Sequence, residues 1–150
     1  MISPFDHPRL QFEGYIETSE CCFKYNCIAH AAGDKENWWW PFGQDLLGRE
    51  AYGPKKAPPK RTIRAFVLAF KSLGYLPCKN GDLESGYEKV AVYVLNNLPT
   101  HMARQLIDGN WSHKMGSDID LSASLTAVEG PVYGTARRYL KRKLIKSWKP

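Results

Sequence analysis

Residues 88–116 constrain the fold more than any other part of the chain. Residues 88–95, EKVAVYVL, are rich in β-branched and aromatic side chains, which is typical of a central strand. Two further β-compatible runs, residues 101–106 and 111–116, are joined through the pair Asp108-Gly109. Because an Asp-Gly pair between two such runs is a strong hairpin signal, this part of the chain predicts an antiparallel sheet.

Three other segments are predicted to be helical. Apolar side chains at helical spacing predict a helix over residues 62–73. Residues 25–33, YNCIAHAAG, predict a short helix that begins after the N-cap residue Asn26. Residues 135–148 alternate apolar and basic side chains, as an amphipathic terminal helix does. Helices at both ends of a run of antiparallel strands define an α+β fold, which we expect to form a single domain over residues 1–150.

Length and composition exclude several classes of protein. The chain has 150 residues, of which 43% are apolar and 24% charged, so it can bury one core without disulfides. No apolar run approaches the roughly 20 residues that span a bilayer, so no transmembrane segment is expected. The polar N-terminus shows no signal peptide. We therefore expect a cytoplasmic protein, or one exported without an N-terminal signal peptide, with its four cysteines as free thiols.

The net charge of +6 comes from one end of the chain. Residues 1–136 hold 14 of the 21 basic residues and all 15 acidic ones, and residues 137–150 hold the other seven bases. A basic terminal helix could bind an anionic partner such as a nucleic acid or an anionic membrane. Its alternative role is structural, with the apolar face docked and the charges in solvent.

Cys27 and His101 form the candidate catalytic pair. Cys27 falls in the first turn of the short helix, directly after Asn26, where the helix dipole favours a thiolate and would lower the thiol pKa. His101 opens a predicted strand 74 residues later and would act as the base. The alternative for Cys27 is a buried structural thiol.

A third residue would orient the imidazole of His101. A two-residue turn at Asp108-Gly109 would set Gly116 opposite His101, which brings Asp118 near the ring, with Asp120 as the next choice. The other histidines have weaker placements: His7, His30 and His113.

The run Trp38-Trp39-Trp40-Pro41 allows two interpretations. The three indoles either wedge partly into the core or wall a cleft for an extended, peptide-like substrate. A metal site is not expected, because Cys21, Cys22, Cys27 and His30 do not match a zinc-site spacing. No nucleotide-binding glycine motif occurs, so no cofactor is expected either.

Several motifs resemble those of an uncharacterised bacterial domain family. They are NCIAHAAG, WWWP, LESGYEKVAVY, THMARQLIDGNWSHKMG and VEGPVYG, and together they span most of the chain. This chain departs from the family pattern at two positions: His30 stands where the family shows Trp, and His113 where it shows Ser.

The order of these residues also resembles the papain-like cysteine hydrolases, including bacterial cell-wall peptidases and papain-fold toxins. That resemblance implies a nucleophile helix packed on an antiparallel sheet, with Cys27 as nucleophile, His101 as base and Asp118 as orienter. The oxyanion donor would be Asn26 or a backbone N–H. It further implies hydrolysis of an amide bond in a peptide or protein by a peptidase, amidase or glutamine deamidase, possible toxin or effector activity, and control by an inhibitor or immunity protein. The alternative function is a non-enzymatic binding module that uses Trp38–Trp40 and the basic terminal helix.

Overall fold

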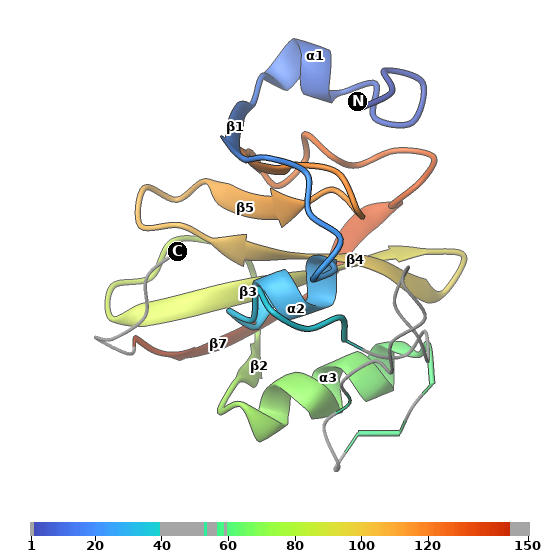
Figure 1. Ribbon diagram of the computed structural model, residues 1–150. Coiled ribbons are helices and arrows are strands. Elements are labelled where there is room, and N and C mark those ends of the chain that lie inside the picture. The colour runs from blue at the N-terminus through green and yellow to red at the C-terminus, as the bar shows by residue number, and fades with distance from the viewer. Residues whose placement is uncertain (1, 40–52, 54–56, 59, 145–150) are drawn as a thin grey trace.

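A seven-stranded antiparallel sheet in the order β1-β6-β5-β4-β3-β7-β2 organises the chain (Figure 1). The structure is a computed structural model that describes residues 2–39, 53, 57–58 and 60–144. The strands are β1 (Ile16–Ser19), β2 (Leu76–Cys78), β3 (Tyr87–Leu95), β4 (Leu98–Gln105), β5 (Trp111–Lys114), β6 (Asp120–Ala123) and β7 (Thr135–Lys143). The helices of the described residues are α1 (Leu10–Glu13), α2 (Cys27–Ala31) and α3 (Ile63–Ser72).

The two longer helices begin where the sequence predicts them. The Asn26 side chain accepts a hydrogen bond from the backbone N–H of Ala29 and caps α2. Thr62 caps α3 in the same way through Ala65. Four of the five residues of α2 are buried, and α3 buries the face that carries Ala65, Phe66, Ala69 and Phe70.

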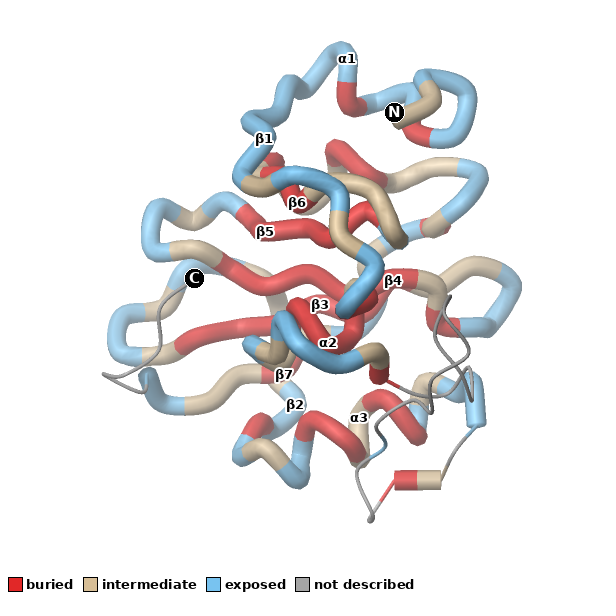
Figure 2. The backbone as a smooth tube through the Cα atoms, in the orientation of Figure 1, coloured by how far each residue is buried: buried red, intermediate tan, exposed pale blue. Residues whose placement is uncertain are grey.

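Both faces of the sheet are covered. One face carries α2 and α3, with a core that includes Phe66, Phe70 and Met102. The opposite face carries a second core, in which Leu10 and Val128 pack against Tyr93 and Leu121 of the sheet. Burial is therefore concentrated on the central strands β3, β4 and β5 (Figure 2).

The papain-like arrangement predicted from the sequence is wrong. The sheet dominates the fold, and the described helices have only four, five and ten residues. The chain remains a mixture of helices and strands, but it is not a helical layer packed against a small sheet.

The predicted basic C-terminal helix is also wrong, because residues 135–143 form strand β7. This strand lies between β3 and β2 and pairs with both. Tyr139 packs into the core on one face and Leu140 into the core on the other. This alternation is expected of a strand in a sheet that is covered on both faces. The apolar residues whose spacing suggested a helix are therefore divided between the two faces of the sheet.

The hairpin between β4 and β5 forms, with a different register from the one predicted. Its loop is longer than two residues, since Gln105 pairs with Trp111 and the Leu106 N–H bonds the Asn110 carbonyl. Ala103 consequently lies opposite His113. This shift of one residue turns the His113 side chain to the other face of the sheet, which decides the geometry of the candidate site.

Candidate functional site

Cys27 is the first residue of α2, held at its position by Asn26. Besides capping the helix, Asn26 accepts a hydrogen bond from the Trp39 N–H at 3.3 Å and donates one to the Trp39 carbonyl at 2.9 Å. The side chain therefore fastens the start of α2 to residue 39. With its amide engaged in this way, Asn26 has a positioning role, and a backbone N–H is the better oxyanion donor.

The Cys27 thiol is buried against the backbone of strand β4. Burial raises the pKa of this thiol above its usual value, while hydrogen bonding from the Met102 backbone acts to lower it. The sequence predicted that the helix N-terminus would lower the pKa of the Cys27 thiol. Desolvation has the larger effect and raises this pKa instead. Pairing of β4 with β5 begins at Ala103, so the edge of β4 at Met102 lies beyond this pairing.

His101 lies in strand β4 and is completely buried. Its ring stacks on Tyr133, with ring centres 4.1 Å apart and planes within 7°, and meets the edge of Tyr93. Burial lowers the pKa of His101 well below its usual range, so the ring is neutral at pH 7.

His101 and His113 are joined directly. Nε2 of His101 lies 3.0 Å from Nδ1 of His113, and the two rings stack with centres 5.3 Å apart. Burial lowers the pKa of His113 to about 3, so this ring is also neutral. The other nitrogen of His101, Nδ1, is buried and has no hydrogen-bond partner among the described residues.

The Cys27 thiol lies in the surroundings of His101 without a hydrogen bond to it. The thiol contacts Met102, the next residue in the strand, and its charge would raise the pKa of Tyr133, the stacking partner of His101, in addition to the larger effect of burial. Cys27 packs with the core on the helical face, whereas the ring partners of His101 belong to the other core. The Cys27 thiol and the His101 ring therefore belong to the cores on opposite faces of the sheet, with the backbone of β4 at Met102 between them.

The two predicted orienting acids do not contact His101. Asp118 Oδ1 accepts a hydrogen bond from the Ile119 N–H, and the Asp118 carbonyl accepts one from Lys114. Asp120 accepts a hydrogen bond from the Tyr25 hydroxyl at 2.6 Å. The hydrogen-bond partner of His101 is His113, not either of these acids.

A second buried polar cluster lies on the helical face of the sheet. His30 Nε2 is 2.7 Å from the Ser112 hydroxyl, and His30 Nδ1 is 3.8 Å from Asp120. Burial lowers the pKa of His30 to about 4. These contacts hold α2 against strands β5 and β6. They therefore also position Cys27, which lies one turn before His30 in the same helix.

The tryptophan run does not line a cleft within the described residues. Trp39 is buried, donates its indole N–H to Asp34 and contacts the Phe70 ring in the core. Trp38 is half-buried, and Trp40 lies outside the described residues. Trp39 is therefore a core residue.

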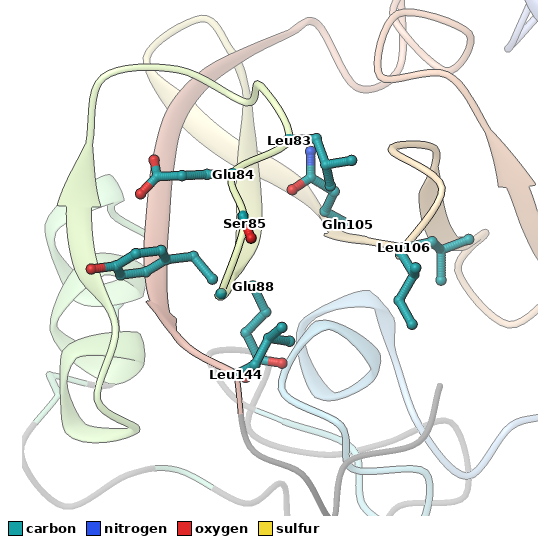
Figure 3. A pocket seen from close by; sticks show the side chains of 10 residues that line it. Leu83, Glu84, Ser85, Glu88, Gln105, Leu106 and Leu144 are labelled. Carbon is teal, nitrogen blue, oxygen red and sulfur yellow. The ribbon is translucent and has the colours of Figure 1, made fainter.

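An apolar hollow of about 470 Å³ lies at the other end of strand β4 (Figure 3). The residues that line it include Leu83, Glu84, Glu88, Gln105, Leu106 and Leu144. None of the lining residues contacts His101, so this hollow is separate from the histidine pair.

No group of three or more metal-ligating side chains occurs within the part of the chain that the structure describes. In the same part, no helix has the length and apolar character needed to cross a membrane.

The chain belongs to a family of domains of unknown function, DUF7689, whose match covers residues 16–141. Searches of curated proteins and of solved structures return no match. The family therefore includes α2 and the described strands almost completely, together with Cys27, His101 and His113.

Proposed function

We propose that the protein is a cysteine hydrolase that cleaves an amide bond in a peptide or protein. Cys27 is the nucleophile, His101 is the base and His113 positions the His101 ring. The observation that carries the proposal is the His101–His113 hydrogen bond, which leaves His101 Nδ1 buried and without a partner in the described structure.

The proton arrangement follows from this contact. A proton on Nε2 of His101, donated to Nδ1 of His113, leaves Nδ1 of His101 as an acceptor. In the proposed reaction this acceptor nitrogen takes the proton of Cys27. His113 selects the tautomer of the base, which is the role an acid has in many catalytic triads.

The reaction proceeds by acyl transfer. His101 Nδ1 takes the proton of the Cys27 thiol as sulfur attacks the carbonyl carbon, and the tetrahedral oxyanion collapses to a thioester. The proton passes from His101 to the departing amine, and water, activated by the same nitrogen, hydrolyses the thioester. Because burial favours the neutral forms of both Cys27 and His101, proton transfer accompanies attack and no ion pair is stored beforehand.

The test is site-resolved alkylation with iodoacetamide, read by mass spectrometry, in the wild-type protein and in a His101→Gln variant. We expect Cys27 modification to slow by a factor of about ten or more in the variant, within the range for loss of a general base. Cys22 takes no part in the proposed pairing, so its rate should be unchanged, which makes it the internal control. Equal Cys27 rates in two folded proteins would refute the pairing.

Cleavage itself is tested with a pool of fluorogenic peptide amides. The wild-type protein should release fluorophore, and a Cys27→Ala variant should not, because removal of one small thiol leaves the fold intact but removes the nucleophile. Release by Cys27→Ala at the wild-type rate would exclude the proposed nucleophile.

A further inference from the structure

A second hollow, of about 380 Å³, lies where three segments meet: the turn between β3 and β4, the start of β7 and the start of α3. All three segments lie on the right-hand side of Figure 1. The lining residues are Ile63, Val94, Asn96, Asn97, Arg137 and Arg138. Their polar groups are two guanidinium groups and two amides, so the hollow is rich in hydrogen-bond donors.

The two arginines carry charge that no acid of the described residues neutralises. Arg137 donates to the Thr135 hydroxyl and Arg138 to the Arg137 carbonyl, and neither forms an ion pair with a described acidic side chain. Two of the three basic residues further along β7 differ in this respect. Lys141 pairs with Glu84 at 2.7 Å, and Arg142 pairs with the buried Glu88. Two of the three β7 bases without a described ion pair therefore lie at the hollow, and the third, Lys143, is exposed at the far end of the strand.

The turn places its amides beside these arginines. Asn96 and Asn97 both have positive φ, 53° and 65°, as the two central residues of a type I′ hairpin turn do. A third base is close, because Arg61 donates from Nε to the carbonyl of Pro99 in the adjoining strand. Arg61 and Arg64 are both exposed, and they add to the positive potential around the start of α3.

We propose that this hollow binds the phosphate group of a small phosphorylated ligand. Two guanidinium groups form charge-assisted, forked hydrogen bonds with phosphate oxygens, and amide N–H donors complete the coordination. The volume of about 380 Å³ fits one small group of this kind. The proposal does not depend on Cys27 chemistry, since none of the lining residues belongs to the cysteine and histidine site.

The test is calorimetric titration of the full chain with inorganic pyrophosphate and, separately, with ADP. We expect saturable binding that weakens by a factor of about ten or more in an Arg137→Gln, Arg138→Gln double variant, because the variant loses the charge-assisted hydrogen bonds to the phosphate oxygens. A Lys71→Gln, Lys143→Gln double variant removes the same charge from exposed positions elsewhere, and it should bind within a factor of about two of wild type.

The two ligands distinguish the sources of the phosphate. Similar affinities would show that the hollow recognises phosphate alone, and tighter binding of ADP would show a nucleotide ligand. The proposal is overturned if neither ligand binds saturably, or if both double variants weaken binding equally, as non-specific charge attraction would require. Circular dichroism of each variant confirms that the sheet is retained.

Discussion

Nε2 of His101 lies 3.0 Å from Nδ1 of His113, so two buried neutral histidines from adjacent strands form one hydrogen-bonded pair. The contact depends on the register of the β4–β5 hairpin, in which His113 lies opposite Ala103. Because side chains alternate between the two faces of a strand, the same hairpin displaced by one residue would direct the two rings to opposite faces. The hydrogen bond between His101 and His113 therefore depends on the hairpin register as well as on the presence of the two histidines.

Replacing His113 tests its positioning role. In His113→Ala the N–H of His101 loses its acceptor, so the protein should lose about 1–3 kcal/mol of stability and Cys27 alkylation should slow. In His113→Asn the amide oxygen can still accept this proton, so the alkylation rate should recover at least in part. The rates are measured with iodoacetamide below the unfolding transition.

His7→Ala is the matched control for this experiment. His7 is buried and also contacts the Tyr133 ring, at 4.8 Å between centres, but it forms no hydrogen bond with His101. Its removal should change stability without a comparable change in Cys27 reactivity. If His7→Ala and His113→Ala slow alkylation to the same extent, the effect is one of packing and His113 has no special role.

The pH dependence of Cys27 alkylation should follow its raised pKa. Burial disfavours the thiolate, so the fraction of thiolate at pH 7 is smaller than for an ordinary thiol, and the rate should still increase above about pH 9. We expect the rate of Cys27 alkylation by iodoacetamide to show no plateau between pH 6 and pH 8.5 when the native protein is labelled for fixed times. A plateau below pH 7 would show that the helix N-terminus and nearby charges outweigh burial.

The local structure around the site could be predicted from the sequence. Asn26 and Thr62 are side-chain caps, and a cap followed by apolar residues at helical spacing identifies a helix start without tertiary information. The hairpin was also predictable, because Asp108-Gly109 separates two β-compatible runs. Both signals are local in sequence.

The errors arise where tertiary pairing overrides local pattern. Tyr139 and Leu140 bury on opposite faces because β7 lies between β3 and β2, and nothing within residues 135–148 reveals these partners. His113 was ranked too low for a related reason. A two-residue turn places it on the face away from His101, and only the longer loop closed by Leu106 and Asn110 restores the contact.

The buried histidines should make the protein sensitive to acid. Burial lowers the pKa of His30 to about 4 and of His113 to about 3, and the pKa of His101 lies well below its usual value. In the unfolded chain these groups titrate near pH 6.5, so below that pH the unfolded state binds more protons and stability falls as pH decreases. Each histidine should contribute a loss of about 2 kcal/mol between pH 7 and pH 5.

Urea unfolding at pH 7, 6 and 5 measures this loss. A His30→Gln variant keeps an N–H donor for Ser112 but removes one titrating group, so its stability should decrease less steeply with acid than that of the wild type. Identical pH dependence of the two proteins would show that His30 does not contribute. A wild-type midpoint that is constant from pH 7 to pH 5 would contradict the neutral burial of all three histidines.

Gly134 allows the loop that carries Tyr133 to pass close against strand β3. Its φ is 71°, and a Cβ atom at this position would overlap the carbonyl of Val94 and lie 3.0 Å from Cα of Leu95. Because these are backbone atoms of a paired strand, they cannot move aside cheaply. We expect Gly134→Ala to cost about 3–5 kcal/mol, the sum of left-handed strain and overpacking.

Gly116→Ala separates the two contributions. Gly116 has a similar φ of 61°, but an added Cβ would meet no atom within 4 Å, so only backbone strain of about 1–2 kcal/mol applies. Gly134→Ala should also displace Tyr133 from the His101 ring and so change Cys27 alkylation, whereas Gly116→Ala should not. Urea unfolding and iodoacetamide labelling of both variants measure these effects. Equal destabilisation by the two substitutions would mean that close approach to Val94 does not constrain the loop, and that the placement of Tyr133 on His101 depends on other contacts.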